Sequence, residues 1–174
     1  MYRLLFPFIL AFCAHGVFAN TNSLESALAT FYDAKEEADY DRALELFEGL
    51  YEKNPKDAEV AFNYGRSLYR EQRIEEADEV LSANIKRYPD HVESHYVLGS
   101  VKLTLVSQVS LFRKIGMAKD AIAAWEKTVE LEPGHVEALY GVVEFYLNAP
   151  GMAGGDKEVG RAKLKQLESL SKPW

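Results

Sequence analysis

Three histidines could in principle form a metal site. His91 and His95 stand four positions apart, so both side chains would share one face of a helix, and His135 follows later in the chain. His91 and His135, however, occur in nearly identical contexts, Pro-Asp-His-Val-Glu and Pro-Gly-His-Val-Glu, which indicates equivalent turns in a repeat. Since there is no His-Glu-x-x-His motif and no cysteine near them, the sequence predicts no metal site and no cofactor.

A glycine-rich stretch from Ala149 to Asp156 is a second candidate for chemistry. It precedes a helical pattern, and free backbone amides at the start of a helix attract anions. A phosphate-binding loop requires Gly-Lys-Ser/Thr, whereas here Gly155 is followed by Asp156 and Lys157. Asp156 is therefore expected to cap the helix itself. Small-ligand or anion binding at this loop is an alternative function.

Composition and charge limit the other classes. No nucleophile with a plausible base can be named, so the sequence predicts that the protein is not an enzyme. The net charge of −7 argues against nucleic acid and anionic membranes as partners, because phosphate contacts need a basic face.

The elements that position these residues repeat along the chain. Between Ala58 and Pro89, apolar residues at helical spacing predict two helices joined by a short polar turn at Arg73. Gly65 and Ala77 are small enough for the two axes to approach closely. Pro55 and Pro89 are 34 residues apart, and further positions recur at the same interval.

These motifs resemble the tetratricopeptide repeat, whose pattern is aromatic-x2-Leu-Gly-x2-Tyr, then Ala-x3-Phe, then Pro. The middle unit keeps Tyr64, Gly65, Leu68, Ala77, Leu81 and Pro89. The first unit keeps Ala43, Phe47 and Pro55, and the third keeps Leu98, Gly99, Ala121, Trp125 and Pro133. Phe31 and Val143 stand where the first and fourth units should have glycine.

The resemblance implies an all-α, right-handed superhelical solenoid of about four helix-turn-helix repeats, at about 23–56, 57–90, 91–134 and 135–171, ending in a capping helix. The third repeat is enlarged: Gly65 to Ala77 spans 12 residues, but Gly99 to Ala121 spans 22, so ten residues are added within 102–116. The added stretch is apolar. It either packs onto the core or projects as a hairpin that binds a partner.

Residues 1–19 resemble a secretory signal peptide. Arg3 precedes an apolar run from Leu4 to Phe12, and Val17-Phe18-Ala19 resembles a cleavage site. Cleavage after Ala19 would leave residues 20–174 as one domain without Cys13, the only cysteine. We therefore expect export to the periplasm or the exterior of a bacterium, with no stable membrane insertion. A retained N-terminal anchor is the alternative, although the apolar run is shorter than the roughly 20 residues that a spanning helix needs.

In the tetratricopeptide family, the first helix of each repeat lines a concave face that binds peptides. The resemblance places these residues on that face: Tyr32, Phe62, Asn63, Arg66, Tyr69, Arg70, Tyr96, Ser100, Tyr140 and Glu144. The family's clamp for the C-terminal carboxylate of chaperone peptides is not matched, because only Asn63 fits it and Leu28, Tyr32, Glu93 and Val97 do not.

The expected function is therefore a non-enzymatic interaction or scaffold module that binds a protein or peptide on its concave face. Aromatic and arginine side chains are the usual anchors of protein interfaces. Arg66, Tyr69 and Arg70 favour a peptide with an acidic group, lying against repeats two and three. The alternative is a structural subunit of a cell-envelope assembly that binds through the hairpin at 102–116.

Overall fold

The structure is a computed structural model that describes residues 15–108 and 110–170. Within these ranges it contains eight α-helices, one short 3₁₀-helix and no strand. The helices are α1 (His15–Tyr32), α2 (Glu37–Lys53), α3 (Ala58–Arg70), α4 (Ile74–Arg87), α5 (Val92–Val106), α6 (Leu111–Leu131), α7 (Val136–Asn148), η1 (Gly151–Ala153) and α8 (Lys157–Leu170).

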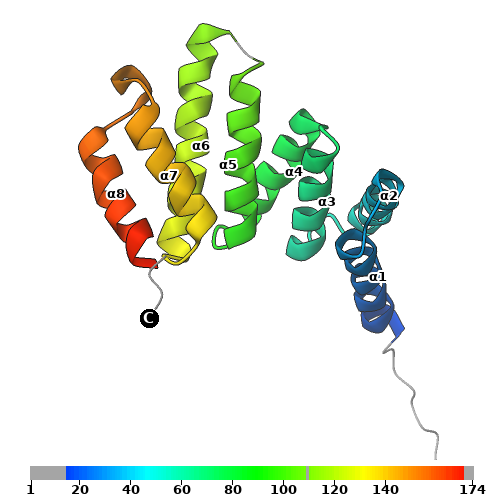
Figure 1. Cartoon of the computed structure of the whole chain (residues 1–174). Coiled ribbons are helices and arrows are strands. Elements are labelled where there is room, and N and C mark those ends of the chain that lie inside the picture. Colours follow the sequence, from blue (N-terminus) through cyan, green and yellow to red (C-terminus); the bar gives the residue numbers. More distant parts are fainter. Residues whose placement is uncertain (1–14, 109, 171–174) are drawn as a thin grey trace, which may run out of the picture.

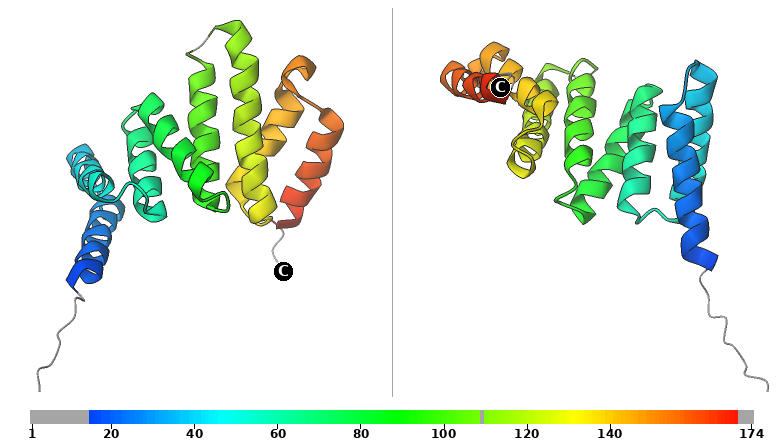
Figure 2. Two further views of the ribbon diagram at one scale, coloured as in Figure 1. Left: turned by 180° about the vertical axis from the view of Figure 1, so that it is seen from behind. Right: turned by 60° about the horizontal axis from the view of Figure 1, so that its bottom comes forward.

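Consecutive helices form four antiparallel pairs, and each pair packs against the next along a curved row (Figure 1). The two ends of the row are the α1–α2 pair and α8, and the views in Figure 2 agree on this order. The predicted all-α solenoid of four helix pairs with a closing C-terminal helix is thereby confirmed.

Small residues allow the close approach within the second pair. Ala77, Leu68 and Leu81 are completely buried between α3 and α4. A Cβ atom built on Gly65 would lie 2.7 Å from the Leu81 side chain, which is inside van der Waals contact. The sequence motif thus reports a real steric requirement.

The third pair contains the longest helix of the described residues, α6. Its helices contain 15 and 21 residues, against 13 and 14 in the second pair, so nine of the ten added residues extend helices (36 − 27 = 9). The tip of this hairpin extends beyond its neighbours (Figure 1). Leu105 of the added stretch is buried, whereas Leu103 is 46% exposed. Val109 lies outside the described residues.

The expected signal peptide falls mostly outside the described residues, which begin at His15. Helix α1 starts there, before the expected start of the first repeat near residue 23. Across the described part of the chain, every helix is too short or too polar to span a membrane.

Candidate functional site

The three histidines considered for metal binding each have a ring nitrogen in contact with a backbone group of the chain. His91 and His135 are the N-caps of α5 and α7, where their Nδ1 atoms accept hydrogen bonds from Ser94 N and Ala138 N, each at 3.2 Å. Each ring also packs on an aromatic ring of the preceding repeat, Phe62 at 5.4 Å and Tyr96 at 4.6 Å between centroids.

His95 is buried, with its Nε2 atom 2.8 Å from the Pro89 carbonyl oxygen. Among the described residues, no group of histidine, cysteine and acidic side chains has the arrangement of a metal site.

The glycine-rich loop has few free amides to offer an anion. The backbone amides of residues 153–156 all donate to carbonyl oxygens, the last of them to Tyr146 O at 3.0 Å. The Oδ1 atom of Asp156 accepts from Glu158 N at 2.9 Å and Val159 N at 3.2 Å, so the predicted cap of α8 is confirmed. A carboxylate of the chain itself therefore occupies the start of this helix.

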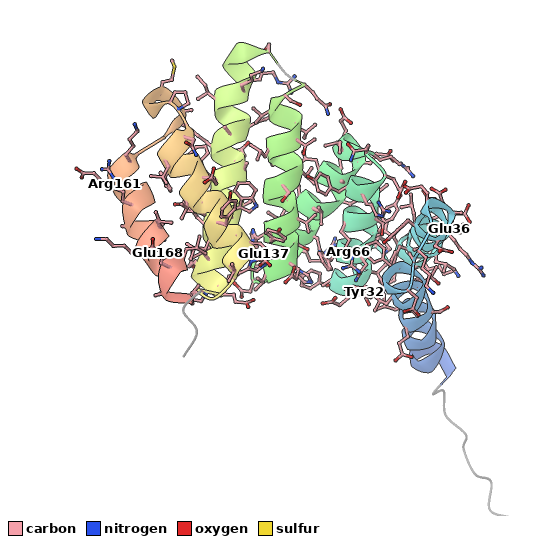
Figure 3. The ribbon with its side chains drawn as sticks, in the orientation of Figure 1. Tyr32, Glu36, Arg66, Glu137, Arg161 and Glu168 are labelled. Carbon is pink, nitrogen blue, oxygen red and sulfur yellow. The ribbon has the colours of Figure 1, made fainter. Side chains whose placement is uncertain are left out.

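In the first half of the expected concave face, Arg66 is enclosed by aromatic rings. Its guanidinium carbon lies 4.2 Å from the centroid of Phe31, 4.9 Å from Tyr32 and 5.3 Å from Phe62. Nη1 donates to the Tyr32 hydroxyl at 2.9 Å, while Nε and Nη2 are buried without an acceptor among the described residues. Figure 3 shows Arg66 beside Tyr32 where α3 meets α1. Arg66 thus joins the first two repeats.

The other residues expected in this half are also engaged. Arg70 lies 3.3 Å above the centroid of Tyr40 and pairs with Glu37 at 3.4 Å. The Tyr69 hydroxyl bonds to Thr104 Oγ1 at 3.2 Å. Asn63 is buried and its Nδ2 donates to the carbonyl oxygen of Glu59 at 2.7 Å. The contacts of Arg70 and Tyr69 join α3 to α2 and α5, whereas the Asn63 bond lies within α3.

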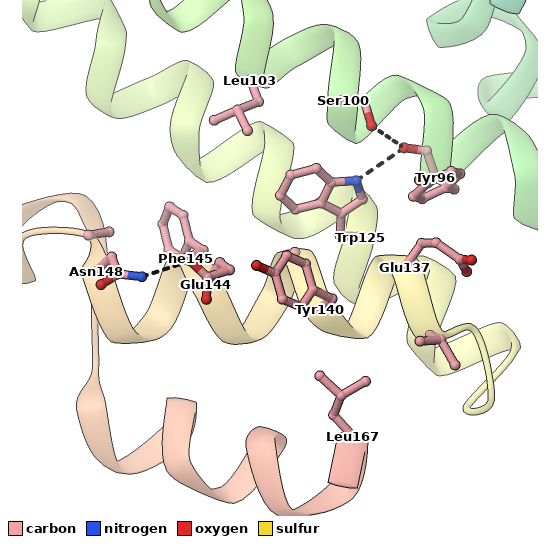
Figure 4. A pocket seen from close by; sticks show the side chains of 13 residues that line it. Tyr96, Ser100, Leu103, Trp125, Glu137, Tyr140, Glu144, Phe145, Asn148 and Leu167 are labelled. Atoms are coloured by element: carbon pink, nitrogen blue, oxygen red, sulfur yellow. Dashed lines mark hydrogen bonds between the residues drawn. The ribbon is translucent and has the colours of Figure 1, made fainter. Parts of the chain in front are cut away.

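The second half contains an open groove of about 930 Å³ between α5, α6, α7 and α8. Four expected residues line it: Tyr96, Ser100, Tyr140 and Glu144. Tyr140 is 57% exposed and points into the groove from α7 (Figure 4). The volume of the groove is at the upper end of the range for small-molecule pockets, which is roughly 300–1,000 Å³. The groove is larger than a second pocket, of about 300 Å³, at the junction of α2, α3 and α4.

Trp125 of α6 lies at the base of this groove. Its Nε1 donates to the Tyr96 carbonyl oxygen at 3.1 Å. Cβ atoms built on Gly99 and Gly141 would lie 2.5 Å and 2.8 Å from the indole ring, so only glycine lets α5 and α7 approach it from both sides. The indole therefore fixes the spacing between the two helices that form the groove walls.

The remaining walls are apolar and the rim is acidic. Leu103, Val136, Phe145 and Leu167 line the groove beside Trp125, and Glu137 and Glu144 are the only charged residues in its described lining. Burial, and then the charges of Glu137 and Glu93, raises the pKa of the Tyr96 hydroxyl above its usual range. The electrostatic potential at the rim of the groove is therefore negative.

Sequence reasoning missed five of the apolar lining residues as site residues: Leu103, Trp125, Val136, Phe145 and Leu167. Trp125 was recognised only as a repeat-motif residue, and Leu103 only as part of the added stretch. Gly141 was the one signal in the sequence for such a wall, because a glycine inside a helical pattern often marks a place where a bulky side chain packs closely.

Comparisons with known proteins agree with this geometry. The tetratricopeptide-repeat family model matches residues 34–100. No curated protein sequence matches this chain. Similar solved structures include TTC0263, a tetratricopeptide-repeat protein of Thermus thermophilus, with 22% identity, a TM-score of 0.69, and coverage of 87% of this chain and 74% of that chain.

Two further structures have the same fold. MamA of Desulfovibrio magneticus RS-1 is 16% identical, with a TM-score of 0.64, and the match covers 87% of this chain and 75% of that chain. The first tetratricopeptide domain of Spaghetti (RPAP3), bound to the HSP90 peptide SRMEEVD, is 16% identical, with a TM-score of 0.58 and coverage of 71% and 86%. The tetratricopeptide-repeat model thus matches residues 34–100, and the fold of a tetratricopeptide-repeat protein extends over 87% of the chain.

Proposed function

We propose that this protein is a non-enzymatic interaction module that binds a segment of a partner protein in the groove between α5 and α7. One observation carries the proposal. Tyr140, Leu103 and Val136 are 57%, 46% and 42% exposed, and they line one open groove. A contiguous patch of exposed apolar side chains often marks an interaction surface on a protein.

Two further points support it. Interface anchors are typically aromatic, and the groove brings Tyr96, Trp125 and Tyr140 together. A domain of the same fold, that of RPAP3, has been solved with a bound peptide. The other expected concave residues, from Tyr32 to Arg70, lie on the preceding repeats, so a longer partner segment would continue over them.

The test compares two charge insertions. Leu103→Glu with Tyr140→Glu places carboxylates in the groove, whereas Leu46→Glu places one on exposed Leu46 of α2. Immobilised wild-type protein and each variant would be used to capture partners from extracts of the source cells. We expect the Leu46 variant to retain the wild-type partner and the groove variant to lose it, with unchanged helical circular dichroism. Retention of the same partner by the folded groove variant would refute the proposal.

We also propose that the protein is exported to the periplasm or the cell exterior. The proposal rests on the N-terminal sequence, in which the apolar run from Leu4 to Phe12 is followed by the Val17-Phe18-Ala19 site. Its action on a partner would then take place outside the cytoplasm.

A further inference from the structure

We propose that the segment bound in the groove is basic as well as apolar, with lysine or arginine residues flanking its apolar anchor. The inference rests on the proposed function, since it names the chemistry of the partner at the same groove. It follows from the charges that surround the groove and from the state of the arginines elsewhere on the concave face.

The acidic residues have a regular spacing on α7. Glu137, Tyr140 and Glu144 line the groove together, three and four positions apart, which is the spacing of one helix face. At a rise of 1.5 Å per residue, Glu137 and Glu144 are separated by about 10 Å along the helix axis. The exposed tyrosine ring therefore lies between two carboxylates.

A third carboxylate extends this charge toward α5. Glu93 stands one helical turn before Tyr96 and is 3.9 Å from the His135 ring, which in turn is 3.5 Å from Glu137. No lysine or arginine is among the described residues that line the groove. Lys163 of α8 precedes the lining residue Leu167 by one turn but is not itself part of the lining.

Among the described residues, no lysine or arginine forms an ion pair with Glu93, Glu137 or Glu144; Glu93 and Glu137 lie instead near the His135 ring. Glu144 accepts a hydrogen bond from the neutral amide of Asn148 at 3.0 Å. Figure 4 shows Glu137 and Glu144 on either side of Tyr140. An acidic partner segment would meet repulsion here, whereas a basic one would find two acceptors at the edges of the apolar surface.

The arginines that favoured an acidic peptide are already engaged within the chain. Arg66 is stacked on Phe31, and Arg70 is stacked on Tyr40 and paired with Glu37. Releasing either one for a ligand would break these contacts. Charge complementarity therefore favours a basic partner at the groove.

The experiment uses the buried indole of Trp125 as a reporter of groove occupancy. The chain has two tryptophans, so Trp174→Phe leaves Trp125 as the single emitter. Three synthetic helical peptides without tryptophan would share one leucine-phenylalanine stripe and differ only in two flanking residues: lysine, glutamine or glutamate. Each would be titrated into the full-length protein at low and high salt, with the fluorescence change as the signal.

We expect the lysine peptide to bind about twofold to thirtyfold more tightly than the glutamine peptide, because each of its two exposed ion pairs contributes about 0.2–1 kcal/mol. The glutamate peptide should bind most weakly, and high salt should compress the differences. Glu137→Gln with Glu144→Gln should equalise the three affinities. The matched control, Glu45→Gln with Glu52→Gln, changes two exposed glutamates seven residues apart on α2 and should preserve the order.

The outcomes separate the inference from the proposed function. Equal binding of all three peptides, or tightest binding of the glutamate peptide, would overturn the basic-partner inference while leaving the groove as the site. If none binds, and Tyr140→Glu also leaves capture of the cellular partner unchanged, the proposed function itself fails. Occupancy by the chain's own residues 171–174 would appear as tighter peptide binding after their deletion, and would also overturn the inference.

Discussion

Arg66 illustrates what a single sequence can and cannot predict about one side chain. Its spacing in α3 indicated an inward-facing position beside Phe62. It could not indicate that Phe31 and Tyr32, from the preceding repeat, would surround the guanidinium. Packing between repeats depends on superhelical geometry, which a 34-residue period alone does not specify.

We expect Arg66→Ala to lower the free energy of unfolding by about 1–2 kcal/mol, because it removes the stacking on three rings and the bond to the Tyr32 hydroxyl. Lysine should not restore the loss, since it lacks the planar guanidinium. Urea denaturation would measure the change. Arg161→Ala, at an exposed site on α8, should cost less than about 0.5 kcal/mol. Equal stability of the two variants would contradict the packing role of Arg66.

Two glycine substitutions should change stability in opposite directions. In Gly141→Ala the new Cβ would meet the Trp125 ring at 2.8 Å, so the variant should lose about 1–3 kcal/mol. Gly49→Ala, inside α2 with nothing within 4 Å of the new Cβ, should gain up to about 1 kcal/mol. Denaturation midpoints would report both. Stabilisation by Gly141→Ala would contradict the close packing of α7 on the Trp125 indole.

At the scale of elements, the sequence predicted that the third pair adds ten residues within 102–116, but not how they divide between its two helices. Counting from Gly99 to Ala121 gave ten extra residues. The structure distributes them unequally, with α6 gaining seven residues over α4 (21 − 14) and α5 gaining two over α3 (15 − 13). Apolar residues at helical spacing fit either helix, so periodicity alone could not locate the turn.

Tyrosine–glutamate bonds link successive pairs and should make stability depend on alkaline pH. The Tyr64 hydroxyl of α3 donates to Glu48 of α2, and burial together with this glutamate raises the pKa of Tyr64 to about 12. The folded state thus holds the proton that the unfolded chain releases near pH 10. The contribution of the Tyr64–Glu48 bond to the free energy of unfolding is complete below about pH 10 and is lost as pH rises through about 12.

The expected signature is a shrinking difference between wild type and Tyr64→Phe in the free energy of unfolding, measured by urea denaturation from pH 9 to pH 12. Tyr146 donates to Glu126 in the same way, and its pKa is also raised to about 12. Tyr146→Phe should therefore behave alike. Tyr140→Phe, at a 57% exposed residue, is the control. A constant difference for Tyr64→Phe across this range would contradict the assignment.

At the scale of the whole molecule, the repeat period predicted the solenoid, whereas the groove depended on departures from the period. The groove lies between the third pair, whose helices are longer than those of the second, and α7, the first helix of the fourth pair. In α7, Val143 stands where the motif has glycine, and Gly141 stands two positions earlier. Four of the ten expected concave residues line it, because residues three and four positions apart share one face of a helix. The wall residues from α6 and α8 could be found only from the tertiary structure.

Export makes a prediction about the mature chain. If residues 1–19 are removed by a signal peptidase, the protein purified from its native source should begin at Asn20, and intact mass spectrometry would show the loss. Val17→Arg with Ala19→Arg should block processing, since cleavage needs small residues at these positions. An unprocessed wild-type chain in the cytoplasm would contradict export.

The most direct measurement of the groove's role is site-specific photo-crosslinking to the natural partner. A photoreactive amino acid would replace Tyr140 in the groove, Arg113 near the tip of the α5–α6 hairpin, or Leu46 on α2, and adducts would be mapped by mass spectrometry. If the groove binds the partner, position 140 forms an adduct that the lysine peptide displaces, and positions 113 and 46 do not. An adduct at 113 with none at 140 would contradict the groove as the binding site and assign binding to the hairpin.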